Sequence, residues 1–334
     1  MSCALRALGS VVLCSSLVLG CGGGGGGSGV GNSTGALVPL ASSNGATAGD
    51  VAVDAVLRAV GPTQDASGWL KPGADAPATV AGFSPARWAV AQLVAAREQV
   101  ASAVAAGKPA TQAVINDGGP CPSGGSVSLT HDDADNDQQV STGDTVRLSF
   151  SGCNVFGISI QGQVLLDSIV ANGAPFADFS GSLRVTFDLH LGDDQDFLAL
   201  DGTLSLSVLD DGTVASLSIS TPSLTIQGNS QATTLTDLSI SYAENMFTGG
   251  YAWSGSGTVT DSRLGGSVAF STLQAFTGQE SSEHPSSGAM LITGANGSKV
   301  RITVMGPDAV RVEIDADNDG TYEDSSTTTW AGFD

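Results

Sequence analysis

Hydrophobic and polar residues alternate with a period of two through much of the second half of the chain. In LRVTFDLHL, residues 183–191, the alternation runs for nine residues without a break. It recurs in further segments: Leu204, Leu206 and Val208; Leu217 and Ile219; Leu224 and Ile226; Leu238, Ile240 and Tyr242; Val300, Ile302 and Val304; and Val310, Val312 and Ile314. Such alternation is typical of antiparallel strands with one buried and one solvated face. We therefore expect a mainly β domain over residues 109–334.

Turn signals between these segments indicate how the strands are connected. Asp201-Gly202 and Asp211-Gly212 lie between apolar segments, and Asp-Gly favours tight hairpin turns. The regular spacing predicts a long antiparallel meander that forms a curved sheet, a sandwich or a barrel. A transmembrane barrel also alternates, but it requires aromatic girdles, and aromatic residues make up only 5% of this chain. We therefore favour a domain outside the bilayer.

Residues 50–108 have a helical pattern instead. Asp50 is a suitable N-cap for VAVDAVLRAV, which stops at a Gly-Pro pair. A second helix is expected to begin with Ser84 as N-cap and Pro85 at its first position, and to end at Gly107. Its apolar stripe comprises Val90, Leu93, Val94, Val100 and Val104. We expect a helical hairpin packed on the β domain, with partner recognition by the stripe as the alternative.

The first twenty residues read as an export signal. Arg6 precedes an apolar run of about 14 residues, which is shorter than the roughly 20 needed to span a bilayer. The run ends in VLGC, which resembles the lipobox of bacterial lipoproteins, where the signal is cleaved before the cysteine and the cysteine is lipidated. The resemblance implies a signal peptide over residues 1–20 and lipidation of Cys21. An ordinary signal peptide is the alternative.

The segment after Cys21 is rich in glycine and serine and behaves as a flexible coil. We interpret residues 21–49 as a tether between the lipid and the folded domain. In the bacterial lipoproteins that the chain resembles, an aspartate after the cysteine tends to signal inner-membrane retention. Gly22 in this position implies the outer membrane, on its periplasmic or its surface face.

Charge is distributed unevenly. Residues 1–109 carry a net charge of +1 and residues 110–334 a net charge of −22, which together make the −21 of the chain. A domain this acidic repels nucleic acid and anionic membrane surfaces. We therefore expect cations or basic partners, and the only membrane contact that we predict is through the lipid anchor. A protein or glycan ligand is not identified by the sequence.

Two cysteines remain once Cys3, Cys14 and Cys21 are assigned to the signal and the anchor. In an oxidising compartment Cys121 and Cys153 most simply form a disulfide, with two free thiols as the alternative. Around them, pairing Val127 with Leu148 and Leu129 with Val146 would form a hairpin that keeps apolar residues side by side. The disulfide would then close the open end of this hairpin, with one residue absorbed in a bulge.

The pentapeptide DADND occurs twice and supplies the candidate metal ligands. In the second copy, Asp315, Asp317 and Asp319 match the first three ligands of an EF-hand-like calcium loop, with Gly320 at the sixth position. Thr321 offers its carbonyl oxygen and Glu323 occupies the ninth position. The twelfth position holds Ser326 instead of a bidentate glutamate, and the flanks read as strands. Calcium binding is one interpretation and a solvated acidic turn is the other.

The first copy lies at the tip of the predicted hairpin and is the second candidate. Its ligands would be Asp133, Asp135 and Asp137, with Asp144 at the twelfth position. Gln138 replaces the glycine, so we expect the second copy to be the better calcium site. His131 beside the first copy is weak evidence for a transition metal.

No catalytic residue is assigned from the sequence. The pattern G-x-S-x-G at residues 31–35 lacks the strand and helix that a hydrolase nucleophile needs. His190 and His284 have no evident partner. The cluster of Asp193, Asp194 and Asp196 could supply a carboxylate pair for glycoside hydrolysis but is also typical of a solvated turn.

The β part also resembles uncharacterised β-rich lipoproteins of Gram-negative bacteria. The residues that carry this resemblance are Cys121, GDTVRLSFSGC at residues 143–153, and VRVEIDADNDGTYE with Trp330 near the end. The resemblance implies location and fold. We expect a lipid-anchored envelope protein with a non-enzymatic structural or binding role, stabilised by calcium. The alternatives are a calcium-dependent module that binds a glycan or another ligand, and an envelope hydrolase.

Overall fold

The computed structural model describes ten segments of the chain. They are residues 35–60, 85–105, 114–121, 123–155, 158–172, 180–193, 197–228, 231–279, 281–282 and 284–330. The predicted signal peptide, Cys21 and most of the predicted tether lie outside these residues.

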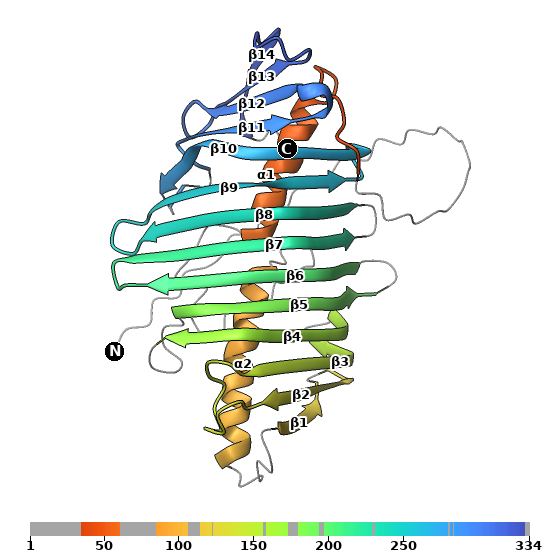
Figure 1. Ribbon diagram of the computed structural model, residues 1–334, viewed down its shortest axis with the longest axis vertical. Coiled ribbons are helices and arrows are strands. Elements are labelled where there is room, and N and C mark those ends of the chain that lie inside the picture. The colour runs from red at the N-terminus through yellow and green to blue at the C-terminus, as the bar shows by residue number, and fades with distance from the viewer. Residues whose placement is uncertain are drawn as a thin grey trace, which may run out of the picture. The chain divides into compact units, whose positions relative to one another are not determined.

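All strands of the described residues belong to a single antiparallel sheet, whose fourteen strands are ordered as they are in the sequence (Figure 1). Its strands are β1 (Val114–Pro120), β2 (Ser126–Asp132), β3 (Thr145–Val155), β4 (Ile158–Asn172), β5 (Ser180–Gly192), β6 (Phe197–Asp210), β7 (Val214–Gly228), β8 (Ala232–Asn245), β9 (Gly250–Asp261), β10 (Gly266–Gln279), β11 (Ser287–Thr293), β12 (Lys299–Val304), β13 (Val310–Asp315) and β14 (Asp324–Thr328). Each strand pairs with the next, so the predicted meander is confirmed. β1 was not predicted as a strand.

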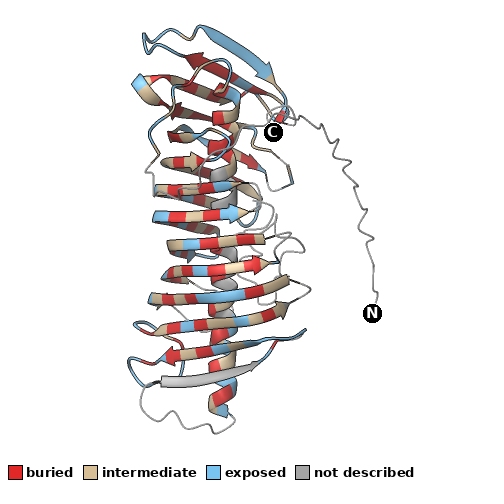
Figure 2. Ribbon diagram, turned by 90° about the vertical axis from the view of Figure 1, so that its right-hand side faces the viewer, coloured by how far each residue is buried: buried red, intermediate tan, exposed pale blue. Residues whose placement is uncertain are grey.

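The predicted alternation matches the burial of the strands. In β5, buried and more exposed residues alternate along the whole strand, and Leu183, Val185 and Phe187 are at most 2% exposed. Figure 2 shows the same succession of buried and exposed positions along the strands of the sheet. The apolar face of the meander therefore forms the core, as expected for strands that are solvated on one side only.

Helix α1 (Gly45–Val60) begins earlier than predicted. Asp50 is therefore not its N-cap but lies inside the helix, where its carboxylate forms an ion pair with Arg263 (2.7 Å). The preceding residues are packed rather than tethering, because Leu40 is 1% exposed and the N–H of Val38 donates to the carbonyl of Ser267 (3.0 Å). This part of the predicted tether is therefore packed against the sheet.

Helix α2 (Pro85–Ala105) begins at the predicted proline, and its described part ends before the predicted Gly107. Of the predicted stripe, Leu93 and Val100 are buried, and the side chains of Val90 and Val94 lie outside those described. The other buried residues of the described helix face are alanines: Ala86, Ala89, Ala96 and Ala103. Together these buried positions recur at three- and four-residue spacing, as a helix face requires. α1 contacts strands from β8 to β13, whereas α2 contacts α1 and β1 (Figure 1). The helices therefore help to cover the apolar face.

Only one of the two predicted Asp-Gly turns is present. Asp211 and Gly212 connect β6 to β7, where Asp211 Oδ1 accepts hydrogen bonds from the N–H groups of Thr213 and Val214. Asp201 and Gly202 instead lie inside β6. A Cβ atom at Gly202 would be 2.3 Å from the carbonyl oxygen of Ser223, so glycine is required here by the close approach of β7.

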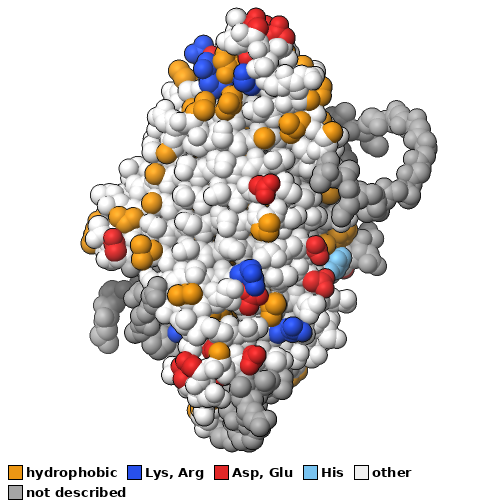
Figure 3. Space-filling view, viewed as in Figure 1, with side chains coloured by type: hydrophobic (Ala, Val, Ile, Leu, Met, Phe, Trp, Pro, Cys, Tyr) orange, Lys and Arg blue, Asp and Glu red, His pale blue; other side chains and the backbone are white. Residues whose placement is uncertain are grey.

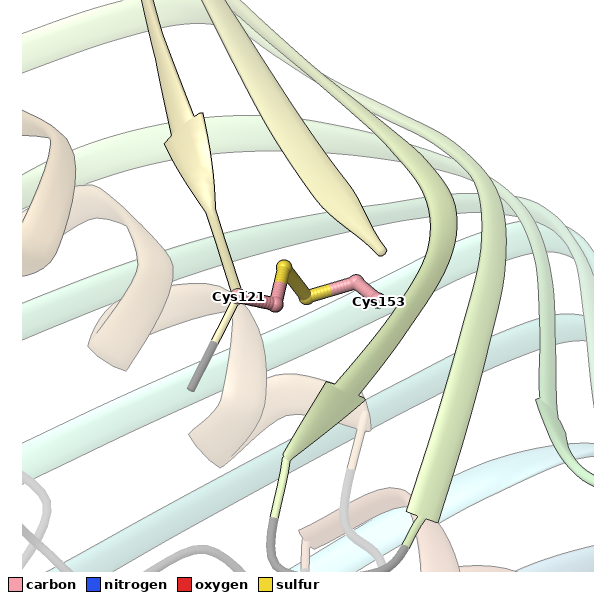
Figure 4. The surroundings of a disulfide bond; sticks show 2 residues. All are labelled: Cys121 and Cys153. Carbon is pink, nitrogen blue, oxygen red and sulfur yellow. A yellow bond between two sulfur atoms is a disulfide. The ribbon is translucent and has the colours of Figure 1, made fainter. Parts of the chain in front are cut away.

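The predicted disulfide is present (Figure 4). Cys121 directly follows β1 and Cys153 lies in β3, and their Cα atoms are 5.4 Å apart. The predicted hairpin register is wrong by two residues, because Val127 pairs with Phe150 and Leu129 with Leu148. A shift of two residues keeps every side chain on its own face, so alternation alone cannot distinguish the two registers.

The solvated face of the sheet consists mainly of small uncharged residues. In Figure 3 most of this face is neither charged nor hydrophobic. A shallow groove of about 410 Å³ crosses β4 to β8 on this face. It is lined by eight serine residues of these strands, by Arg184 and by the apolar residues Leu183, Leu206, Ile219 and Ile240. Serine lies opposite serine across several strand pairs, for example Ser207 and Ser218. The lining of the groove is thus both polar and apolar, and Arg184 is its one charged residue.

Candidate metal centre

The two DADND segments lie in turns between consecutive strands. The first acidic loop, residues 133–144, connects β2 to β3, and the second acidic loop, residues 315–323, connects β13 to β14. Both loops begin with an aspartate at the end of a strand, at Asp133 and Asp315, and in both this aspartate is buried. The sheet therefore fixes the first candidate ligand of each loop, whereas the other two aspartates of each DADND segment are exposed.

In the second acidic loop four carboxylates converge. Asp315, Asp317, Asp319 and Glu323 each place one oxygen atom so that all four lie within 4.8 Å of one another. Asp315 is 1% exposed and the other three are exposed. Four carboxylates and no histidine form an oxygen-only site, which suits a hard cation such as calcium.

The backbone of the second loop curls around its own aspartates. The N–H of Asp319 donates to Asp317 Oδ1 (3.1 Å), and the N–H of Thr321 donates to Asp319 Oδ1 (2.6 Å). Gly320 has a φ of +89° and donates to Asp315 Oδ2 (3.3 Å). The left-handed conformation favours glycine, as expected for the sixth position of a calcium loop.

Asp315 has a buried carboxylate oxygen that is available to a ligand. Its Oδ1 atom is buried and has no hydrogen-bond partner among the described residues. A buried polar atom that lacks a partner costs roughly 1–3 kcal/mol, and more when the group is charged. A cation bound to the cluster through this oxygen would satisfy it and would offset the mutual repulsion of the four carboxylates.

Glu323 closes the second loop, as its predicted position suggested. Its Oε2 accepts a hydrogen bond from the N–H of Ala316 (3.0 Å), which brings the carboxylate back over the start of the loop. Thr321 contributes a backbone N–H to the loop, and coordination by its carbonyl oxygen stays a prediction. Ser326 pairs with Val312 inside β14, so the chain has left the loop by the twelfth position.

The first acidic loop has the same backbone hydrogen bonds but a different carboxylate arrangement. Asp133, Asp135 and Asp137 also bring oxygen atoms within 4.8 Å of one another. However, both oxygens of Asp133 are already bonded, to the N–H of Asp137 (3.2 Å) and to the N–H of Gln138 (2.7 Å). The first loop therefore lacks the unpartnered oxygen of Asp315.

Asp144 does not join the three other predicted ligands of the first loop. It is 0% exposed, and its Oδ2 lies 2.9 Å from His131 Nε2. Its oxygens also accept hydrogen bonds from the N–H groups of Ala134 (2.8 Å) and Ser141 (2.7 Å). Asp144 thus stabilises the first loop through buried hydrogen bonds to its backbone and to His131. The sequence signal for this pair was only the histidine next to DADND.

A lysine beside the second loop was not predicted as part of the site. Lys299 lies opposite Asp315 in the pairing of β12 with β13. Its Nζ is 2.5 Å from Asn318 Oδ1 and 3.7 Å from Asp315 Oδ2. Because Lys299 lies 16 residues before Asp315 in the sequence, no local pattern connects it to the loop.

The residues considered for catalysis lie on different elements. His190 on β5 stacks on Phe197 (5.1 Å between ring centroids), and His284 stacks on Trp330 (5.2 Å). Asp193 directly follows β5, whereas Asp194 and Asp196 lie outside the described residues. Of the G-x-S-x-G segment, the structure describes only Gly35, whose carbonyl accepts a hydrogen bond from the hydroxyl of Ser267 (2.6 Å).

No family model, no curated protein and no solved structure matches this chain. Among the helices that the structure describes, none is both long and apolar enough to cross a membrane. The function is therefore inferred from the geometry of the acidic loops and from the sequence signals at the start of the chain.

Proposed function

We propose that this protein is a lipid-anchored component of the bacterial outer membrane whose β domain has a non-enzymatic structural or binding role and is stabilised by calcium. The observation that carries the calcium part is the buried, unpartnered oxygen of Asp315 within a cluster of four carboxylates. Anchoring through Cys21 rests on the lipobox-like sequence before it.

Calcium is favoured over other ions by the donor set of the second acidic loop. Calcium takes six to eight oxygen ligands in flexible geometry, whereas magnesium demands a tight octahedron and zinc prefers nitrogen or sulfur. The loop offers Asp315, Asp317, Asp319 and Glu323, and water would complete the shell. Because no bidentate glutamate stands at the twelfth position, we expect a dissociation constant of about 10⁻⁴–10⁻³ M, typical of extracellular calcium modules.

An ion at this site would stabilise the last hairpin of the sheet. β14 is mostly exposed and pairs with β13, the strand that ends at Asp315. Coordination by Asp315 and Glu323 would connect the two ends of the turn, so separation of β14 would require loss of the ion. An ion that binds only the folded form at ten times its dissociation constant stabilises that form by about 1.4 kcal/mol.

The test compares equivalent aspartates in the two loops. Asp317 and Asp135 are both exposed, both occupy the third position, and each accepts a hydrogen bond from the N–H two residues later. We expect calorimetry to detect calcium binding by the wild type and by Asp135→Asn, but not by Asp317→Asn. The melting temperature should rise with calcium in the same two proteins. Equal responses from both variants would contradict the assignment of the site.

Lipid anchoring has its own test. Cells grown with an alkyne-labelled fatty acid should incorporate the label into the wild type, and Cys21→Ser should remain unlabelled. Membrane fractionation should then place the labelled protein with the outer membrane. Label on Cys21→Ser, or none on the wild type, would contradict the anchor without affecting the calcium site.

A ligand-binding module is the second candidate function, and the serine-lined groove favours it. Hydroxyl groups without strong charge suit a neutral glycan better than a charged ligand, and the groove crosses β4 to β8. The second acidic loop lies five strands beyond β8, on the order of 24 Å away at about 4.8 Å per strand. Retention on a neutral glucan column should therefore be lost in Ser207→Arg, which fills the groove, and retained in Asp317→Asn. Retention of both variants, or of neither, would contradict a glycan site in the groove.

A further inference from the structure

Lys299 is a basic residue in direct contact with the second acidic loop, where its positive charge would act on a bound cation. Its ammonium group contacts Asn318 Oδ1 at 2.5 Å and lies 3.7 Å from Asp315 Oδ2. Asp315 is the buried member of the four-carboxylate cluster, and its other oxygen is the one without a partner. The lysine therefore lies beside the carboxylate that the proposed ion would also use.

Neighbouring basic residues are engaged elsewhere. Arg301 is bonded to Glu313 (2.8 Å) and lies over the ring of Tyr322 (4.3 Å to the centroid). Arg311 also pairs with Glu313 (3.5 Å). Among the ion pairs of the described residues, the one that involves a cluster carboxylate is that of Lys299 with Asp315.

We infer that Lys299 is a built-in competitor of the ion, which holds the second acidic loop in shape when no ion is bound and sets the calcium concentration at which the loop fills. This inference rests on the proposed calcium site. The ammonium stabilises the ion-free loop by offsetting the charge of Asp315 and by fixing Asn318. The same positive charge repels a divalent cation that binds to the Asp315 carboxylate.

The expected effect is moderate, because the lysine is partly exposed. Its side chain is 31% accessible, so water and salt screen its interaction with the ion. Repulsion between an ammonium and a divalent ion several ångströms apart still changes the dissociation constant roughly tenfold at a solvent-like dielectric constant. Lys299 would thus shift the response of the loop toward the higher calcium concentrations found outside the cell.

The experiment measures calcium binding and ion-free stability for Lys299→Met, Lys299→Arg and Arg311→Met. Methionine keeps the length of the side chain without the charge, arginine keeps the charge, and Arg311→Met removes a nearby charge that does not contact the cluster. We expect Lys299→Met to bind calcium roughly tenfold more tightly than the wild type while melting at a lower temperature in chelator. Lys299→Arg and Arg311→Met should bind within about twofold of the wild type.

Each other outcome has a definite meaning. An unchanged dissociation constant in Lys299→Met, or weaker binding, would overturn the inference while leaving the calcium site in place. An equal tightening in Arg311→Met would also overturn it, because a general charge effect would then suffice. Absence of calcium binding by both the wild type and Lys299→Met would overturn the proposed function itself. The melting temperature of Lys299→Met in chelator is a second readout. It reports the role of Lys299 in the ion-free loop and does not depend on calcium binding.

Discussion

The two acidic loops begin with the same five residues and fold them in the same way, yet the surrounding sheet completes them differently. In both loops the N–H of the fifth residue donates to the aspartate at the third position, and the N–H of the seventh residue donates to the aspartate at the fifth position. The asparagine at the fourth position is left-handed in both, with φ of 60° at Asn136 and 64° at Asn318. The pentapeptide therefore determines the local turn.

The residues after the pentapeptide determine whether a carboxylate is available to an ion. Each loop is closed by a carboxylate that accepts the N–H of its second residue, Asp144 in the first and Glu323 in the second. Asp144 is buried against His131, whereas Glu323 is exposed and reaches the carboxylate cluster. In the first loop, internal hydrogen bonds thus satisfy the buried carboxylates. In the second loop one carboxylate oxygen of Asp315 has no hydrogen-bond partner among the described residues and could bind an ion.

The largest expected difference comes from removal of the two closing carboxylates. Asp144→Ala would leave His131 and two backbone N–H groups without their partner in a buried site, which should lower the free energy of unfolding by several kcal/mol, at roughly 1–3 kcal/mol for each unsatisfied group. Glu323→Ala in chelator should cost less than about 1 kcal/mol, because the group is exposed and makes one hydrogen bond. Urea unfolding measures both. Similar losses in the two variants would mean that the loops are closed in the same way.

The disulfide should have the next largest effect, and only on the part of the sheet that carries the first loop. Cys121 and Cys153 are separated by 32 residues, and such a loop typically contributes about 2–4 kcal/mol. The double variant Cys121→Ala with Cys153→Ala should lose this stability in urea unfolding but keep the wild-type calcium affinity. Loss of calcium binding in this variant would show that the two ends of the sheet are coupled.

Much of the fold was predictable from local patterns in the sequence. A two-residue period identifies strands because one face is buried, and in β5 the prediction and the burial agree at each apolar position. β1 was missed because its sequence, VINDGGP, contains two glycines and a proline and has no alternation. The start of α1 was placed too late, since the packing of Leu40 against the sheet is a tertiary effect that a capping motif cannot reveal.

The candidate site was predictable only where its ligands are close in sequence. The spacing of Asp315, Asp317, Asp319 and Glu323 identified the cluster because a single turn brings these residues together. The same reasoning placed Asp144 among the ligands of the first loop, although the structure turns it toward His131. Whether a carboxylate faces a cation or a histidine depends on its burial and on the neighbouring strand. Neither can be predicted from the sequence of the loop alone.

Exchange of the sixth residue should have a smaller effect than loss of the disulfide. Gln138 has a φ of +63°, and a non-glycine residue in the left-handed region costs roughly 1–2 kcal/mol. Gln138→Gly should therefore stabilise the protein, and Gly320→Gln should destabilise it by a similar amount, both measured by urea unfolding. We do not expect Gln138→Gly to create a calcium site, because the oxygens of Asp133 are already bonded. Calcium binding by a Gln138→Gly, Asp317→Asn double variant would show that the glycine alone distinguishes the loops.

The smallest expected effect concerns the strands that support the second loop. Ion pairs join these strands, whereas a disulfide joins the strands near the first loop. The hydrogen bond from Arg301 lowers the pKa of Glu313 below its usual 4.5 against the opposing effect of burial, and the charges of Arg301 and Arg311 add to this. A lowered pKa means that the stability is present above pH 4.5 and is lost as the pH falls through the lowered value. Glu313→Gln should therefore cost less than about 1 kcal/mol at pH 7. The difference from the wild type should shrink as urea unfolding is repeated toward pH 3, whereas a constant difference would show that Glu313 contributes through its packing and not its charge.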